Sequence, residues 1–175
     1  MHVQTHILFG WCGGNLLPLT PRQRLFCMMA ASLEDIDGLG IVWSQEAYWA
    51  LHHKLGHCIA FGLILSAVLA ALSQRRRLAC FVLFLLLFHL HIGLDVLGSG
   101  ENWDMFYLWP FSDFRIKTWG WPLFSWQNIL AFVLLLIWTI VIAKRQRRTP
   151  LEAIMPSLDH QLVDLLSRRT APAQT

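Results

Sequence analysis

Charged residues are scarce in this chain of 175 residues. Asp, Glu, Lys and Arg make up 14% of it, whereas 55% of the residues are hydrophobic and the mean hydropathy is +0.47. A soluble domain carries about a quarter of its residues as charged side chains. So few charges cannot cover a water-facing surface, and this hydrophobic content also excludes intrinsic disorder. The composition therefore predicts a membrane protein, whose nine Trp and eleven Phe suit a core and the membrane interfaces.

Cysteine motifs and a cleavable leader are also missing. The four cysteines are scattered without CxxC spacing, which favours buried apolar thiols over disulfides or metal ligands. No Lys or Arg precedes Arg22, so we expect no signal peptide with a basic first region. The net charge of +3 comes from clusters beside apolar runs, which indicate membrane topology and not nucleic-acid binding. These clusters are Arg75–Arg77, Lys144–Arg148 and Arg168–Arg169.

Apolar runs predict an all-α fold. We expect a polytopic membrane bundle of about five helices in residues 1–148, followed by a cytoplasmic amphipathic tail in residues 149–175. The runs are Thr5–Leu19, Leu25–Leu33, Cys58–Ser73, Leu78–Leu97 and Asn128–Ala143. The third and fifth runs reach membrane-spanning length only with flanking residues, Ala47–His57 and Trp121–Gln127. The first two form a hairpin that either spans the membrane or lies partly buried in the bundle.

The basic clusters predict the orientation of the bundle. Arg75–Arg77 and Lys144–Arg148 should be cytoplasmic, which places the intervening loop Gly98–Gln127 outside. Arg22 and Arg24 join the cytoplasmic side if the first two helices form a hairpin. We therefore expect a multi-pass protein of the bacterial inner membrane.

Acids and histidines fall at the ends of four predicted helices, which meet on the outer side of an antiparallel bundle. They are His6; Glu34, Asp35 and Asp37; His52, His53 and His57; and His89, His91 and Asp95. Ionisable groups in membrane helices are costly and usually functional. Imidazole and carboxylate together are ligands of zinc, manganese and non-haem iron. The sequence therefore predicts a metal site near the outer face.

The spacing of some of these residues predicts which side of a helix each one occupies. His91 and Asp95 are four apart and share a helical face, whereas His89 points elsewhere and is interpreted as structural. Asp35 and Asp37, two apart, fit a helix end, although a solvated loop explains them equally. Asp95 is the hardest to explain without a site, because a buried carboxylate needs a partner.

The histidine-rich block allows two interpretations. Helical spacing pairs His53 with His57, whereas His52 and His57 are five apart and need a helix start or distortion near Gly56. Ordinary interfacial histidines are the alternative for His52 and His53.

Four motifs together resemble a bacterial family of inner-membrane metal-dependent hydrolases, some of whose members are described as LexA-binding. The motifs are Thr5-His6, Glu34-Asp35-Ile36-Asp37-Gly38, His52-His53-Lys54-Leu55-Gly56-His57 and His91-Ile92-Gly93-Leu94-Asp95. The resemblance implies metal ligands at His6, Asp35, Asp37, His52, His57, His91 and Asp95. It favours His52 over His53 as ligand, because His53 stands where other members have Arg. LexA binding does not fit an outward-facing site.

These observations lead to a hypothesis of metal-assisted hydrolysis at the outer face of the membrane. Seven ligands exceed the needs of one zinc, so we expect two or more divalent ions, zinc or alternatively manganese. Asp35, Asp37 and His53 are the catalytic candidates. The expected substrate is a phosphoester, such as a phospholipid or a lipid-linked phosphate, and the expected partners are membrane lipids. The alternatives are a haem-binding or metal-binding protein without catalysis, and an ion transporter.

Overall fold

A computed structural model describes residues 1–167. Residues 168–175, which include Arg168–Arg169 and the end of the predicted tail, lie outside the described part. The described part is helical, with an isolated β-bridge between Met105 and Ile116. Its elements are α1 (Val3–Gly14), α2 (Pro21–Ala30), the 3₁₀ helix η1 (Leu33–Val42), α3 (Gln45–Leu51), α4 (Ile59–Leu72), α5 (Arg77–Gly98), α6 (Trp126–Gln146) and α7 (Pro156–Ser167). The predicted all-α fold is confirmed for these residues.

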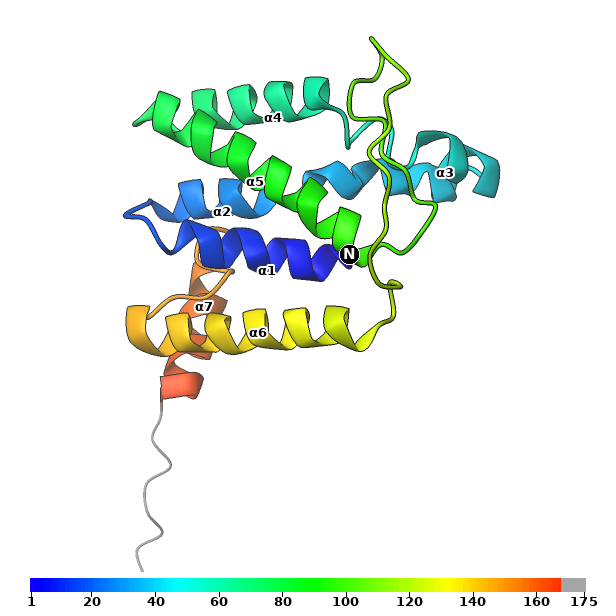
Figure 1. Ribbon diagram of the computed structural model, residues 1–175. Helices are drawn as coiled ribbons and strands as arrows, with labels where there is room; N and C mark the ends of the chain where they lie inside the picture. The colour runs from blue at the N-terminus through cyan, green and yellow to red at the C-terminus, as the bar shows by residue number, and fades with distance from the viewer. Residues whose placement is uncertain (168–175) are drawn as a thin grey trace, which may run out of the picture.

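The helices α1, α2, α4, α5 and α6 pack side by side and form a bundle (Figure 1). α1 packs between α2 and α6, and α5 packs against α4 and α2. α7 crosses one end of the bundle, where it contacts α6, and α3 lies at the opposite end with the connection 99–125. The four cysteines are free and buried, as their apolar surroundings predicted.

Two of these helices are long and apolar enough to cross a membrane. They are α5, with 22 residues, and α6, with 21. The helices α1, α2 and α4 have 12, 10 and 14 residues. At about 1.5 Å per residue, none of the three reaches the roughly 30 Å of a hydrocarbon core. The prediction of about five spanning helices is therefore not confirmed.

The third predicted helix is interrupted. The chain leaves α3 at His52, and α4 begins only at Ile59. Between them His53 has a left-handed backbone with φ of 62°, which a regular helix does not contain. This break shortens α4 and frees the histidine-rich block to form a loop.

The two ends of the bundle differ in charge. The α1–α2 connection, the α4–α5 turn and the end of α6 lie at the same end, beside α7 (Figure 1). These segments carry the described basic clusters, including Arg75–Arg77 and Lys144–Arg148. The arrangement is the one that the positive-inside rule required. Which end faces the cytoplasm stays a prediction.

Candidate metal centre

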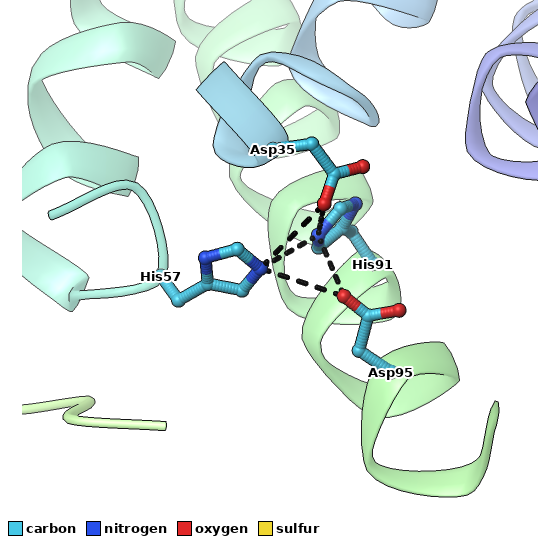
Figure 2. Close-up of side chains that lie close together, drawn as sticks. All are labelled: Asp35, His57, His91 and Asp95. Carbon is cyan, nitrogen blue, oxygen red and sulfur yellow. Dashed lines mark hydrogen bonds and ion pairs between the residues drawn. The ribbon is translucent and has the colours of Figure 1, made fainter. Parts of the chain in front are cut away.

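Four acidic and imidazole side chains converge at the end of the bundle opposite α7. Asp35 comes from η1, His57 from the loop before α4, and His91 and Asp95 from neighbouring turns of α5 (Figure 2). One ligand atom from each lies within 4.8 Å of all the others. His57, His91 and Asp95 are buried, and Asp35 is partly exposed. We call these four residues the metal centre.

The distances within the metal centre are short. The Nε2 atoms of His57 and His91 are 3.3 Å apart, and Asp95 Oδ2 lies 3.4 and 3.2 Å from them. Asp35 Oδ1 lies 3.9 Å from each Nε2 atom. Four ligands around zinc, each about 2.0–2.2 Å from the ion, are about 3.3–3.6 Å from one another. The four donors therefore surround a point that suits a metal ion after small side-chain shifts.

Both histidines are oriented by their other ring nitrogen. His91 Nδ1 donates to the carbonyl of Ala31 at 3.0 Å, and His57 Nδ1 donates to Asp37 Oδ2 at 3.0 Å. Metal-binding histidines almost always use such a contact to a carbonyl or carboxylate, which fixes the ring and its tautomer. It directs both Nε2 atoms toward the metal centre.

Asp37 holds the loop together and is not part of the metal centre. Its Oδ1 accepts from His52 Nδ1 at 2.8 Å, and its Oδ2 accepts from the backbone N–H of Gly56 at 3.1 Å as well as from His57. Burial by itself would raise the pKa of Asp37, but the hydrogen bonds from His52 and His57 lower it far below its usual range. With both oxygens in use, Asp37 orients ligands.

Glycine is required where this loop meets η1. A Cβ atom on Gly56 would lie 1.9 Å from the carbonyl oxygen of Glu34. No side chain fits in that space, so the close approach of the two backbones depends on Gly56. This contact brings Asp37 of η1 within reach of His57.

Burial and hydrogen bonding shift the pKa of two groups in and beside the metal centre. Glu34 is fully buried, neither of its oxygens has a hydrogen-bond partner, and burial raises its pKa to about 8. Burial lowers the pKa of His57, but hydrogen bonds to Asp37 and Asp95 outweigh it and raise the pKa to about 10. His57 thus keeps a second proton, in the position where a metal ion would bind and displace it.

His6 contacts the metal centre from α1. Its Nε2 lies 3.0 Å from Asp95 Oδ1, the oxygen that faces away from the other ligands. The His6 ring packs against His91 with 3.9 Å between centroids, and its Nδ1 is buried without a partner. The amino group of Met1 also contacts Asp95 Oδ1 and donates to Ser99 Oγ at 2.9 Å. His6 therefore positions Asp95.

A small cavity of about 70 Å³ opens beside the metal centre. Asp35 and Asp95 form its inner part, and its other lining residues include Tyr48, His52, His53, Trp103 and Leu123. Neither Lys nor Arg is found among its lining residues in the described part of the chain. A second cavity of about 220 Å³ shares His52, His53 and Trp103 with it and adds Asn102 and Arg115. The two cavities therefore adjoin at His52, His53 and Trp103, beside the metal centre.

His53 lies at this opening. Its Nδ1 donates to the carbonyl of Trp103 at 2.8 Å. Burial, together with the neighbouring His57 and His52, lowers the pKa of His53 to about 3, so the ring is neutral. It lines both cavities and is absent from the metal centre.

The structure thus divides the seven ligands implied by the resemblance. It gathers Asp35, His57, His91 and Asp95, and it places the other three one contact away: Asp37 and His52 on the loop side, His6 beside Asp95. The helical pairing of His53 with His57 is wrong, because that segment is not helical. His89 contacts Leu85 and Tyr107, away from the metal centre.

Sequence reasoning missed three neighbours of the metal centre. Glu34 was placed in the converging acid cluster but was given no role of its own, although a carboxylate next to Asp35 in an apolar segment was a usable signal. Nothing in the sequence placed Tyr48 or Trp103 at the opening, because both depend on how α3 and the connection 99–125 fold back over the loop.

One family model matches nearly the whole chain. It is described as YdjM inner membrane protein and covers residues 1–167. No curated protein and no solved structure matches the chain. The description agrees with the two apolar helices α5 and α6 and with the predicted inner membrane. It names neither hydrolysis nor LexA binding.

Proposed function

The chain belongs to the YdjM inner membrane protein family, and we propose that it is a metal-dependent hydrolase acting on a phosphoester at the outer face of the inner membrane. One observation carries the proposal. Two buried imidazole Nε2 atoms face each other at 3.3 Å between two carboxylate oxygens, and each ring is fixed through Nδ1. A bound cation would offset the free-energy cost of burying these polar atoms so close together.

The donor set favours zinc. Two imidazoles and two carboxylates are common zinc ligands, and manganese is the alternative when oxygen ligands dominate. A bound divalent ion supplies Lewis acidity and lowers the pKa of a coordinated water. One ion per chain fits the metal centre. A second would need further ligands, of which His52 and His6 are the nearest.

Asp35 is the proposed catalytic base. It is the only partly exposed member of the metal centre among the described residues, and it lines the small cavity. Its Oδ2 is buried without a hydrogen-bond partner, and in the proposed mechanism a water that enters through the cavity hydrogen-bonds to this oxygen and gives up a proton to it. Asp37 cannot do so, because its hydrogen bonds occupy both oxygens.

His52 and His53 are the proposed contacts for the substrate. Both line the two cavities, so a phosphoester that enters through them contacts these histidines next to the metal centre. A neutral imidazole can donate a hydrogen bond to a phosphate oxygen or give a proton to the departing alkoxide. The exposed Trp43, Trp49 and Trp119 at this end suit the headgroup depth of a bilayer, which favours a lipid phosphoester.

The first test is the metal content of the protein purified in mild detergent. We expect at least one equivalent of zinc or manganese by mass spectrometry, lost in both Asp95→Ala and His57→Ala. His89→Phe is the matched control, because His89 lies on the same helix as His91 but outside the metal centre. Absence of metal from the reloaded wild-type protein would overturn the proposal.

The second test is turnover of phospholipids and of a soluble phosphoester by the metal-loaded protein. We expect hydrolysis that depends on Asp35 and is lost in Asp35→Asn. Full metal occupancy with no turnover would instead support the alternative of a metal-binding protein without catalysis. A haem fits poorly, since the cavity beside the histidines measures about 70 Å³.

A further inference from the structure

One side of η1 is buried, and the opposite side is apolar and exposed. Glu34, Asp37 and Gly40 are buried, whereas Ile36, Leu39 and Val42 are 51%, 54% and 75% exposed. A 3₁₀ helix has three residues per turn, so residues three apart lie in line. One side of η1 therefore faces the protein interior. The other side is a continuous apolar line of Ile36, Leu39 and Val42, which we call the η1 ridge.

The surroundings of the η1 ridge are apolar and aromatic. Trp43 follows it directly with 80% of its surface exposed, and Trp49 on α3 is 58% exposed. Between Leu33 and Leu51 the sequence has no Lys or Arg. Of its acids, Glu34 and Asp37 are buried, Asp35 is partly exposed and Glu46 on α3 is exposed. Exposed Trp beside apolar residues and without basic charge is typical of the interface between lipid headgroups and acyl chains.

The position of η1 places the ridge at that level. η1 continues α2 toward the end of the bundle opposite α7 (Figure 1). Asp35, near the start of η1, lies next to Asp95 in the metal centre. Asp95 in turn lies three residues before the end of α5, which is long enough to span a membrane. This is about 4.5 Å along the helix axis. η1 therefore lies where α5 leaves the bilayer.

We propose that the η1 ridge is seated in the lipid of the outer leaflet, so that the helix that supplies Asp35 is itself a membrane-contacting element. The bilayer is the occupant because the chain belongs to an inner membrane protein family and the ridge lies at the outer end of a spanning helix. Apolar residues are exposed on the bundle helices as well, among them Ile64 on α4 and Leu134 on α6.

The position of the η1 ridge also indicates the class of substrate, an inference that rests on the proposed function. Asp35 and the η1 ridge belong to the same ten-residue helix, so lipid on one side lies about one helix width, roughly 10 Å, from the metal centre. A phospholipid can then reach the opening sideways from the leaflet with its chains still in lipid. The proposed substrate class is therefore a membrane phospholipid, and a small soluble phosphoester serves as a probe that reaches the metal centre without the leaflet.

Spin labels on single cysteines test the position of the ridge in nanodiscs. The native cysteines are buried, so the unmodified protein serves as the blank. We expect labels at Ile36→Cys, Leu39→Cys and Val42→Cys to collide with oxygen more than with a water-soluble nickel chelate, like the lipid-side control Leu134→Cys. The exposed loop control Asp113→Cys should show the reverse. Ridge labels that behave like Asp113→Cys would overturn the proposal, and so would labels protected from both reagents, which indicate a protein partner or a second copy.

Activity tests the sideways route. We expect Leu39→Lys to reduce hydrolysis of phospholipid in vesicles about tenfold, because a charge opposes seating in lipid. Hydrolysis of a soluble phosphoester and the metal content should stay unchanged, as should both activities in Asp113→Lys. Equal losses for both substrates, or none, would overturn the sideways route. If the wild type hydrolyses neither substrate, the proposed function fails while the spin-label result still decides the position of the ridge.

Discussion

The two ends of the bundle both bury charged groups, but among the described residues the buried carboxylate oxygens without a hydrogen-bond partner all lie at one end. Next to α7, all three guanidinium nitrogens of Arg24 have acceptors. Nη2 donates to Glu152 at 2.8 Å, Nε contacts the same carboxylate, and Nη1 contacts the carbonyl of Leu19. Asp159 likewise accepts from the backbone N–H of Thr149 at 2.6 Å. These contacts fasten α7 and its connection to the bundle.

At the opposite end, buried polar atoms remain without partners. They include both oxygens of Glu34, Oδ2 of Asp35 and Nδ1 of His6. Leaving such groups unpaired costs stability, and native proteins rarely accept this without a functional reason. The comparison separates an end that closes the fold from an end that is built to receive a ligand.

Breaking the structural end should produce the largest loss of stability. Arg24→Met leaves the nearly buried Glu152 without its partner, which costs about 3–5 kcal/mol. The double variant Arg24→Met/Glu152→Met should recover much of this loss. Denaturation in detergent measures the stability, and the metal content should match the wild type in both variants. Loss of metal in Arg24→Met would contradict the separation of the two ends.

Removing the metal should produce the next largest effect, at the other end. A ligand present at 100 times its Kd stabilises the native state by about 2.7 kcal/mol. We therefore expect a chelator to lower the melting temperature of the wild-type protein but not that of Asp95→Ala, which has no metal to lose. Equal sensitivity of the two proteins would show that the chelator acts elsewhere.

Asp37→Asn should weaken metal binding without removing a ligand. The amide keeps the shape of Asp37 but loses the charge that orients His57 and His52. Loss of a carboxylate behind a metal-binding histidine reduces metal affinity about 10- to 100-fold. Competition with a fluorescent zinc chelator measures the affinity. An unchanged affinity would show that Asp37 only holds the loop.

The smallest effect is expected for His89→Phe. His89 bonds to the carbonyl of Leu85 and to the hydroxyl of Tyr107, both at 2.7 Å. Losing these contacts should cost about 1 kcal/mol. Metal affinity should not change. A change comparable to that of Asp37→Asn would place His89 in the function of the metal centre.

The parts of the metal centre that lie in regular helix were predictable from the sequence. His91 and Asp95 are four apart in an uninterrupted helix, and the structure brings Asp95 Oδ2 within 3.2 Å of His91 Nε2. Helical spacing fixes such a pair before any tertiary contact forms. The helix itself followed from an apolar run long enough to span a membrane.

The loop ligands were not predictable in the same way. The role of His57 depends on a left-handed His53 and on the contact between Gly56 and Glu34, which are twenty-two residues apart in the sequence. The spacing of Asp35 and Asp37 showed that they point in different directions, but not which one faces the metal centre. That choice follows from the 3₁₀ winding of η1, which the apolar pattern did not reveal.

The three-residue period of η1 also restricts how this segment can change in length. Adding or deleting one residue before Asp37 would turn the rest of the helix by about 120°. An insertion would bring the apolar Leu39 to the buried side, and a deletion would bring Asp37 and Gly40 to the exposed side. Only insertions or deletions of three residues keep Glu34, Asp37 and Gly40 in line. In homologous chains, length variation between Leu33 and Val42 should therefore occur in steps of three.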